Sequence, residues 1–565
     1  MLGLLITIAG IFAQAASAGA AGGGSLAPLN PEFVQYMQQK AEGLPPLTST
    51  PGGHGLGYIP SPVDWSHLKA QRSLLGASML QTFPASYDLR TLNKLTPVRD
   101  QGLCGDCWAF GTFGSLESAL MPGESDDFSE NNLKNLSGFD YSPCSGGTYD
   151  MSTAYLTRWG GPVSEAADPY NTLDYNTSPS GLAPVKHVQD VVILPARTGP
   201  ADNNIIKNAV MTWGAVGVSM YYGDSSYSSI AHSYYYNGAV SANHAVDIVG
   251  WDDNYLAANF STPPPGNGAF IVRNSWGTSW GDNGYFYVSY YDTVFAMSEN
   301  YVFDDGEATL NYSRIYQYDP LGATTYYGYY SNTAWFKNVF TAASSENLTA
   351  VGFYAPAINT TYDIYVFPDN ATLALHQQGT LTNAGYYTIA LSSPVPLTSG
   401  VNFSIEIKLA TPGYNYPVAI EYPFSSYSSS ATASPGQSYI SPDGTTWTDM
   451  TAIYPNTNVC LKAYTGSASS WTIAGTGDFN GDLKKDILLR DPTTGAVDMW
   501  LMNGTSMSSW ATIYQGGDPN WTIAGTGDFS GDGRADILWR NTSTGQVTMW
   551  LMNGTSMSSW ATVLN

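Results

Sequence analysis

QGLCGDCW, at residues 101–108, holds two of the chain's four cysteines. Two cysteines so close together can bind a metal, form a redox pair, or combine a nucleophile with a structural thiol. A zinc site needs a second such pair or nearby histidine ligands, and the other cysteines, Cys144 and Cys460, are isolated. A thioredoxin-like pair follows a strand within a βαβ unit, and no such pattern surrounds this stretch. The remaining reading requires a histidine and an orienting polar group elsewhere in the chain.

The residues from Cys107 onward predict a buried helix. Apolar side chains recur at helical spacing from Trp108 through Phe113 to Leu120. A cysteine at the first turn of a helix, with an imidazolium beside it, has a lowered pKa and is a stronger nucleophile at neutral pH. Strand-like runs follow at 215–222, 245–251, 269–277 and 284–291, so we expect an α+β domain.

The required partners lie in two later motifs. SANHAVDIVGW contains His244, and VRNSWGTSWGDNGYF contains Asn274. Together with C-G-x-C-W, these motifs resemble those of the papain-like cysteine peptidases, and the resemblance covers residues 83–305. It implies that Cys107 is the nucleophile, that His244 is the base and that Asn274 orients the imidazole. It also implies that the Gln101 side chain and the backbone N–H of Cys107 form the oxyanion hole, and that catalysis needs no cofactor.

The same resemblance assigns supporting roles. It implies a Cys104–Cys144 disulfide, a cleft edge at Gly146 and Gly147 where an extended substrate pairs with bare backbone, a pocket residue at Tyr149, and a shield for the His–Asn hydrogen bond at Trp276.

The sequence departs from the family pattern at Asp106, where the family has a small residue. A carboxylate beside the nucleophile would oppose thiolate formation, so we expect Asp106 to face solvent.

The N-terminal region predicts export and latency. Residues 1–18 combine an apolar run with the small-residue stretch ASA, as in a signal peptide. We expect a secreted or cell-surface protein, in which disulfides are stable. Residues 19–82 are rich in Pro and Gly, with one helical stretch at 31–41, and we expect a propeptide. GYIPSPVDWSHL, at 57–68, is predicted to cross the cleft, and cleavage is predicted between Gly76 and Phe83.

Residues 306–465 contain short alternating runs broken by Gly, Pro and Asn, which predicts an all-β sandwich. This region resembles the lectin-like domain that follows the peptidase in some papain-like proteins. The resemblance implies binding to carbohydrate or a cell surface, and a purely structural domain is the alternative. Cys460 is expected to be a buried strand residue.

Residues 466–565 contain an internal repeat. WTIAGTGDF begins at Trp471 and again at Trp521, and MWLMNGTSMSSWAT begins at Met499 and again at Met549. Two repeats cannot close a propeller, which typically needs ~4–8 blades, so the module is open, stacked on a neighbour, or truncated.

Each repeat carries an acidic loop, DFNGDLKKD and DFSGDGRAD. Oxygen ligands at positions 1, 3, 5 and 9, with a backbone carbonyl at position 7, fit a Ca²⁺ loop, and the repeats resemble FG-GAP/VCBS propeller repeats. Ordinary turns without metal are the alternative. The predicted ligands are Asp478, Asn480, Asp482, Lys484 (carbonyl) and Asp486, then Asp528, Ser530, Asp532, Arg534 (carbonyl) and Asp536.

The net charge is −24, from 21 Lys plus Arg against 45 Asp plus Glu, which disfavours nucleic-acid binding. No segment is apolar over a length that spans a bilayer. The sequence therefore predicts a secreted endopeptidase acting on proteins or peptides. Two alternatives remain: a surface adhesin with an inactive papain-like domain, and an exopeptidase or transferase using the same triad.

Overall fold

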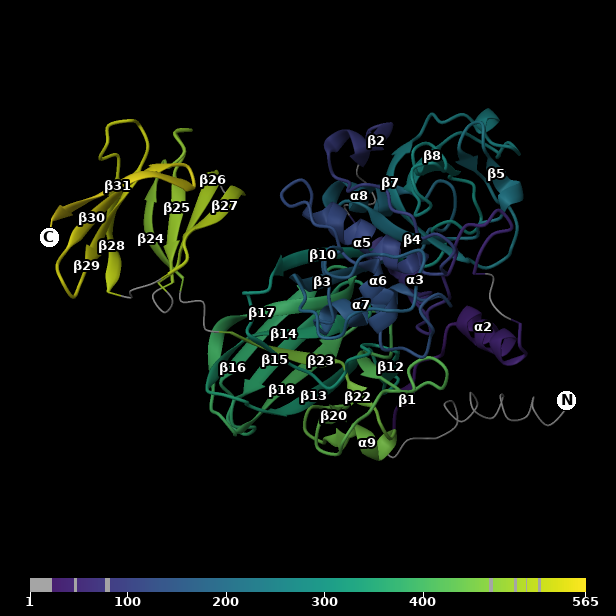
Figure 1. Ribbon diagram of the computed structural model, residues 1–565. Coiled ribbons are helices and arrows are strands. Elements are labelled where there is room, and N and C mark those ends of the chain that lie inside the picture. The colour runs from purple at the N-terminus through teal and green to yellow at the C-terminus, as the bar shows by residue number, and fades with distance from the viewer. Residues whose placement is uncertain are drawn as a thin grey trace. The chain divides into compact units, whose positions relative to one another are not determined.

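The computed structural model describes residues 23–44, 48–76, 82–466, 471–491, 495–504, 506–516 and 520–564. The predicted signal peptide, 1–18, lies outside these ranges. The chain divides into two compact units, and the division falls between Gly466 and Ser467 (Figure 1). Among the described residues, no helix is both long and apolar enough to cross a membrane.

The first unit is built around the predicted buried helix, α5 (Cys107–Leu120). Its small residues let the helix lie close to the neighbouring strands, since a Cβ on Gly114 would lie 2.0 Å from Asp247 Oδ2. Ser115 fixes the helix by donating to the carbonyl of Ala215 and accepting from the N–H of Phe303. The other helices of this part are α6 (Glu130–Leu136), α7 (Tyr149–Thr157) and α8 (Asn204–Thr212), with short 3₁₀ turns η2 (Leu89–Leu92), η3 (Asp224–Ser226) and η4 (Ala257–Asn259).

Helix α5 packs on a 13-stranded sheet of order β11-β23-β14-β17-β3-β10-β4-β7-β8-β9-β6-β5, with β2 paired to β7. The four predicted strand runs are confirmed as β4, β7, β8 and β9. The strands between residues 83 and 308 are β2 (Ser86–Asp88), β3 (Lys186–Leu194), β4 (Val216–Met220), β5 (Tyr227–Ser228), β6 (Ser233–Tyr234), β7 (His244–Asp252), β8 (Ala269–Arg273), β9 (Tyr285–Ser289) and β10 (Asn300–Ala308).

The β-rich region shares this sheet. Strand β17 pairs antiparallel with β3, with Ala384 opposite Ile193, so one ladder runs through both regions. A second sheet, of order β16-β15-β18-β13-β20-β21, packs through an apolar layer that includes Phe336, Ile405 and Val351, and the predicted sandwich is present. Its strands alternate between buried and partly exposed residues, as in β13. The elements are β11 (Arg314–Tyr316), β12 (Thr325–Gly328), β13 (Thr333–Thr341), β14 (Glu346–Ala355), β15 (Thr360–Phe367), β16 (Leu375–Leu381), β17 (Ala384–Leu397), β18 (Asn402–Ala410), β19 (Val418–Glu421), β20 (Ser438–Ser441), β21 (Thr448–Asp449), α9 (Met450–Ile453), β22 (Asn458–Val459) and β23 (Leu461–Gly466).

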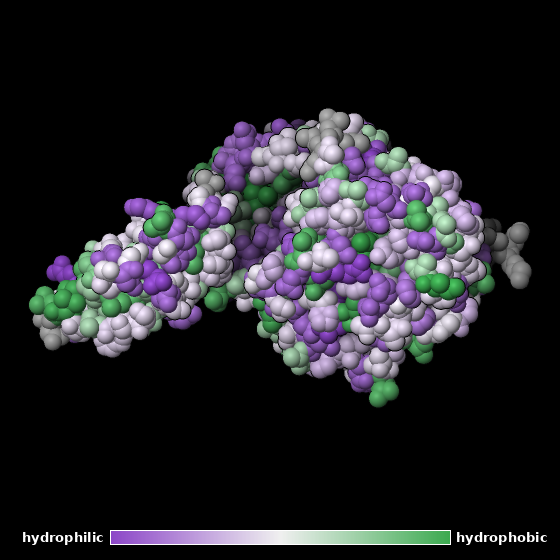
Figure 2. Space-filling view, turned by 90° about the horizontal axis from the view of Figure 1, so that it is seen from above, coloured by the Kyte–Doolittle hydropathy of each residue, from purple (hydrophilic) through white to green (hydrophobic). Residues whose placement is uncertain are grey.

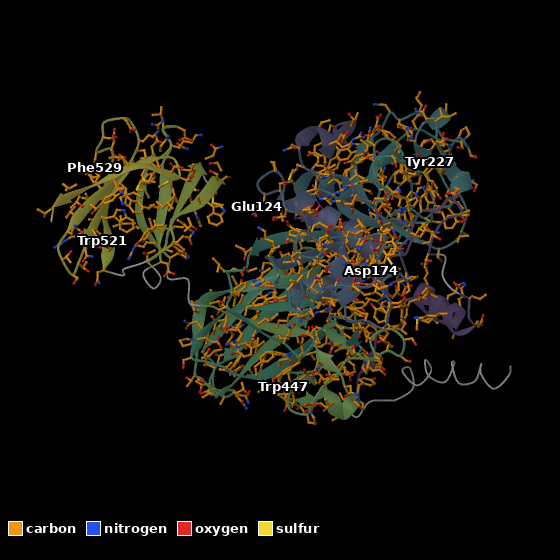
Figure 3. The ribbon with its side chains drawn as sticks, viewed as in Figure 1. Glu124, Asp174, Tyr227, Trp447, Trp521 and Phe529 are labelled. Atoms are coloured by element: carbon orange, nitrogen blue, oxygen red, sulfur yellow. A yellow bond between two sulfur atoms is a disulfide. The ribbon has the colours of Figure 1, made fainter. Side chains whose placement is uncertain are left out.

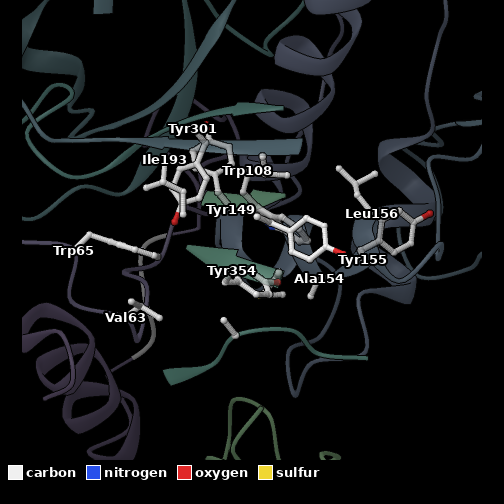
Figure 4. Close-up of a cluster of buried hydrophobic side chains, with 14 of the residues drawn as sticks. Val63, Trp65, Trp108, Tyr149, Ala154, Tyr155, Leu156, Ile193, Tyr301 and Tyr354 are labelled. Carbon is white, nitrogen blue, oxygen red and sulfur yellow. The ribbon is translucent and has the colours of Figure 1, made fainter. Parts of the chain in front are cut away.

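The N-terminal segment is part of this unit. Strand β1 (Ser25–Leu26) pairs with β12 at the edge of a four-stranded sheet, β1-β12-β19-β22. Helix α2 (Pro31–Ala41), capped by Asn30, confirms the predicted helix, and α3 (His67–Gln71) and η1 (Arg72–Leu75) follow. Val63 and Trp65 share one core with Tyr149 of α7, Tyr301 of β10 and Tyr354 of β14 (Figure 4). The segment is therefore packed against both folded regions.

The second unit consists of two four-stranded antiparallel sheets with matching registers. We call them the first repeat sheet, β24 (Thr472–Gly477), β25 (Asp486–Arg490), β26 (Val497–Asn503) and β27 (Ser506–Tyr514), and the second repeat sheet, β28 (Trp521–Gly527), β29 (Asp536–Asn541), β30 (Val547–Asn553) and β31 (Ser556–Leu564).

Candidate active site

Three predicted site residues meet between α5 and the sheet. Cys107 is the first residue of α5, His244 is the first residue of β7, and Asn274 directly follows β8. The imidazole Nε2 of His244 lies 2.8 Å from Oδ1 of Asn274. The N–H of Ala245, next in sequence to His244, donates to Cys107 Sγ at 3.2 Å, so the thiol lies against the start of β7. All three side chains are buried.

Gln101 lies beside this cluster with its amide held from two sides. Its Oε1 accepts from the hydroxyl of Ser275, and its Nε2 donates to the carbonyl of Cys104. The same Nε2 also donates to the carbonyl of Leu56 at 3.1 Å, and the N–H of Cys107 points to that oxygen at 3.5 Å. The two predicted oxyanion donors therefore converge on one carbonyl oxygen, which comes from the N-terminal segment.

Residues 54–59 of that segment lie across the cluster. The N–H groups of Gly57 and Tyr58 donate to the carbonyl of Asn243, which precedes His244. Further along, Gly57 and Ile59 exchange backbone hydrogen bonds with Gly147, and the Tyr58–Gly147 bridge is parallel. The prediction placed 57–68 here, and the residues beyond Ile59 instead enter the shared core.

On the other side of Leu56, the segment lies against Trp276. The indole N–H of Trp276 donates to the carbonyl of Gly55, and the His54 ring stacks on the indole at 4.7 Å. Trp276 also stacks on His244 at 4.8 Å, as its predicted shielding role requires.

The supporting residues are arranged as follows. The predicted Cys104–Cys144 disulfide is present, and Cys107 and Cys460 are free and buried. Gly147 can come close to α5 because it lacks a side chain: a Cβ there would lie 2.3 Å from the Trp108 ring. Tyr149 is buried, with its ring 6.3 Å from that of Tyr58.

The expectation for Asp106 is wrong, because its side chain is fully buried rather than exposed. The hydroxyl of Tyr170 donates to its Oδ2 at 2.7 Å and also reaches the carbonyl of Gln101 at 3.0 Å. Burial raises the pKa of Asp106 to about 7, and the hydrogen bond from Tyr170 opposes that rise. The carboxyl can therefore be neutral at mildly acidic pH, which relieves the conflict with a neighbouring thiolate. No sequence motif pointed to Tyr170.

Burial also dominates the titration of the Cys107–His244 pair. It raises the pKa of Cys107 far above its ordinary range, and nearby Asp106 adds to the rise. Burial lowers the pKa of His244 to about 4, the hydrogen bond to Asn274 raises it, and the neighbouring His54 lowers it further. Under the N-terminal segment, the pair is therefore held as neutral thiol and neutral imidazole.

The predicted Ca²⁺ ligands lie in two loops of the second unit, where their carboxylates accept backbone N–H groups. Asp478 accepts from residues 481–483, and Asp486 accepts from Phe479 and Met502. The second loop repeats this pattern at Asp528 and Asp536. Among the residues that the structure describes, no group of three or more His, Cys, Asp or Glu side chains could hold a metal ion. In this arrangement, backbone N–H groups bind the carboxylates of both loops.

Three family models match successive parts of the chain. Residues 83–303 match the family model of papain family cysteine proteases, 315–465 match a lectin-like domain, and 478–539 match an FG-GAP-like repeat. The chain is 32% identical over 209 residues to a cathepsin L-like peptidase of Aedes aegypti, covering 36% of this chain and 58% of that one. It is 33% identical over 211 residues to cathepsin L1 of Drosophila melanogaster, covering 36% of this chain and 53% of that one. The chain thus spans little more than half the length of these relatives.

A solved structure matches over a longer range. The cysteine protease and lectin-like domains of Cwp84, a surface layer associated protein of Clostridium difficile, superpose with a TM-score of 0.67 at 26% identity, covering 80% of this chain and 99% of that one. The same protein after propeptide cleavage matches with a TM-score of 0.60 at 27% identity, covering 68% of this chain and 99% of that one.

Residues 83–303 therefore match the papain family of cysteine proteases, and matches to a lectin-like domain and to FG-GAP-like repeats follow in the same chain.

Proposed function

We propose that this protein is a cysteine endopeptidase made as a latent precursor, with Cys107, His244, Asn274 and Gln101 as its catalytic residues. The observation that carries the proposal is the convergence of Gln101 Nε2 and the Cys107 N–H on the Leu56 carbonyl oxygen, directly beside the thiol. A peptide carbonyl in that position would have its carbon next to Sγ and its oxygen between two donors. Removing one such donor typically costs ~10²–10³ in rate.

The roles follow from the chemistry of each group. The Cys107 thiolate attacks the carbonyl carbon, and His244 then protonates the leaving nitrogen. Asn274 accepts a hydrogen bond from Nε2 of His244, which leaves Nδ1 for the exchange of a proton with Cys107. Release of the N-terminal segment would return water to the cleft and remove the burial that opposes the ion pair.

The course of residues 54–59 favours an endopeptidase over an exopeptidase. The segment continues past Trp276 on one side of the nucleophile and past Gly147 on the other. A site that accommodates chain on both sides can bind the interior of a polypeptide. The adhesin alternative is disfavoured because all four catalytic positions are filled and brought together.

Latency is supported by the direction in which the segment crosses the site. In a substrate, the residue after the reactive carbonyl must approach His244, which protonates its nitrogen. Here the residues before Leu56, Gly55 and His54, lie against Trp276 beside His244. The nitrogen after Leu56, that of Gly57, instead donates to the carbonyl of Asn243. The segment therefore fills the site in the reverse direction, which protects its Leu56–Gly57 bond.

We further propose a secreted or cell-surface location, since Cwp84 is described as surface layer associated and the predicted signal peptide and the disulfide suit export. Protein or peptide chains are the proposed substrates, and the lectin-like region is the proposed contact to carbohydrate or a cell surface.

The first prediction is that only one of the two free cysteines, Cys107, is needed for catalysis. Cys107→Ala abolishes peptidase activity and leaves the Cys104–Cys144 disulfide intact. Cys460→Ala, which removes the other buried thiol, leaves kcat/KM on a fluorogenic peptide unchanged within about twofold. The measurement is made on the matured protein, and an active Cys107→Ala variant would contradict the assignment.

The second prediction tests latency at Gly57. Its φ is +125° and a Cβ would lie 2.1 Å from the backbone of Gly105, so Gly57→Ala cannot dock as the parent does. The variant precursor is expected to label at Cys107 with a thiol-directed epoxide at least about tenfold faster than the parent, since a few kcal/mol of strain opposes closure. Gly43→Ala is the matched control, because Gly43 lies in the same segment with a φ of +76° and nothing within 4 Å of its Cβ position. Equal labelling of the Gly57→Ala and parent precursors would contradict the masking role.

The third prediction is that acid opens the precursor. His244 has an ordinary pKa of 6.5, lowered to about 4 by burial under the segment. The open state therefore binds a proton at His244 more readily and releases one from Cys107 more readily, so closure is tightest between about pH 6.5 and 9. It weakens as the pH falls toward 4, by up to about tenfold per pH unit, and again as the pH rises above the ordinary pKa of a thiol, 9.0. The measurement is the Cys107 labelling rate of the precursor divided by that of the mature protein at each pH, which cancels the thiol's own titration. His54→Leu, which removes the second imidazole, shifts the opening to lower pH, and a ratio that does not vary with pH would refute the mechanism.

We also propose that the two acidic loops bind Ca²⁺, on the support of their oxygen-bearing residues at positions 1, 3, 5 and 9. Binding requires these carboxylates to exchange N–H partners for the ion. A ligand that binds only the folded state stabilises it by roughly 2.7 kcal/mol at a hundredfold excess over Kd. In calorimetry of the full chain, the transition of residues 467–565 should therefore shift upward in Ca²⁺ relative to chelator, and Asp478→Asn with Asp528→Asn should remove the shift. Identical melting in both conditions would assign the loops as ordinary turns.

A further inference from the structure

The two repeat sheets of the second unit pack against each other through faces that are not equivalent in the repeat. The first sheet contributes Phe479, Leu488, Val497 and Met499 to a shared apolar core, and the second contributes Ala535, Ile537, Trp539 and Met552. The sheets approach each other closely along their first strands, since a Cβ on Gly475 of β24 would lie 2.6 Å from Thr526 of β28. One face of the first sheet therefore meets the opposite face of the second.

Each repeat sheet also has a second face, which is equivalent in sequence to the face that the other repeat sheet buries in the shared core. Residues 50 positions apart are equivalent, as Trp471 and Trp521 show. We call the face of the second repeat sheet that holds Phe529, Leu538, Val547 and Met549 the open second face, since it corresponds to the buried face of the first. We call the face of the first repeat sheet that holds Lys485, Ile487, Leu489 and Met502 the open first face.

Within the described residues, neither open face is covered. Phe479 is 0% exposed and its equivalent Phe529 is 48% exposed. Leu538, Val547 and Met549 are partly exposed, whereas their equivalents in the first sheet are fully buried. Figure 3 labels Phe529, which lies in the loop between β28 and β29, and Figure 2 shows hydrophobic residues in green at the surface of this unit.

Directional hydrogen bonds accompany the buried contact. The N–H of Ala535 donates to the carbonyl of Asp478, and the N–H of Gly554 donates to the carbonyl of Phe479. The Arg490 guanidinium donates to the carbonyl of Trp521.

The equivalent groups exist on the open faces. They are the N–H groups of Lys485 and Gly504 on the open first face, and the carbonyls of Asp528 and Phe529 and the exposed guanidinium of Arg540 on the open second face. Because the strand registers of the two repeats match, including the irregularity between Ile473 and Gly475 and that between Ile523 and Gly525, these groups have the same spacing.

We infer that the open second face docks on the open first face of a second copy of this chain, repeating the contact that the two sheets make within one chain. Arg540 then donates to the Trp471 carbonyl of the second copy, and Phe529 enters the apolar layer beneath that copy's Ile487 and Leu489. The charges agree, because Lys484 and Lys485 of the open first face meet the loop of Asp528 and Asp532 on the open second face.

A head-to-tail contact of this kind leaves an open face at each end unless the assembly closes. Two copies supply four sheets, which is the lower limit for a closed propeller of ~4–8 blades. A dimer closed by two identical contacts therefore buries both open faces of both chains.

The test is the mass of the purified full-length chain in solution, by light scattering and sedimentation. We expect a dimer, and Phe529→Glu and Ile487→Glu each separately raise its dissociation constant by about 30-fold or more, because each places a charge in a buried apolar layer. Trp560→Glu is the matched control. Trp560 is 61% exposed, and its equivalent Trp510 stays 51% exposed although the first repeat sheet has a neighbour, so this position lies outside the repeated contact.

Mixing the two variants gives the decisive measurement. Phe529→Glu keeps an intact open first face and Ile487→Glu keeps an intact open second face, so an equimolar mixture should form a heterodimer through one undamaged contact. Circular dichroism melts that match the parent show that both variants fold. A monomeric parent chain at tens of micromolar, a dimer insensitive to Phe529→Glu, or a mixture that stays monomeric would each overturn the inference.

Discussion

The close approach of α5 to the sheet is the constraint on which the rest of the first unit depends. Gly114 lies so near Asp247 of β7 that no side chain fits between them, and this distance brings Cys107 at the helix start next to His244 at the strand start. The backbone N–H of Ala245 then contacts the thiol directly. Because both groups stand at the first residue of a rigid element, small changes in packing far from the cleft would separate them. The buried hydrogen bonds of Ser115 to Ala215 and Phe303 hold that packing.

The local parts of this arrangement could be predicted from sequence, because the chemistry dictates the residue types. The helix from Cys107 and the strands around His244 and Asn274 follow from short apolar patterns, and the pairing of Cys104 with Cys144 follows from the resemblance to the papain-like peptidases. The pairing of β17 with β3 could not be predicted, since it joins strands almost 200 residues apart and an apolar alternation is compatible with many partners. The sequence therefore did not indicate that one sheet runs through both regions. The exposure predicted for Asp106 is wrong for a related reason. That prediction depended on the conflict between a carboxylate and a neighbouring thiolate, and Tyr170, which donates to the buried carboxyl, lies 64 residues away in the sequence.

The electrostatics of the cleft depend on what covers it. Under residues 54–59, the thiol and imidazole are both buried and both neutral, because taking a charge out of water costs more than the ion pair returns. Asp106 adds to this in the same direction as long as it is ionised, and its raised pKa allows it to become neutral when acid also favours opening. Acid therefore acts on the two groups in a consistent way, weakening closure at His244 and removing a negative charge beside Cys107.

The N-terminal segment has little core of its own, and it is held because it is anchored at several points. Strand β1 pairs with β12, Phe33 packs edge-on against Tyr427, and His67 stacks on Tyr414 at 3.8 Å, all in the lectin-like region. These contacts flank residues 54–59, so this stretch is held at a high local concentration over the Cys107–His244 pair by both of its ends. In the proposed latent precursor, the lectin-like region would therefore contribute to closure without contacting the proposed catalytic residues.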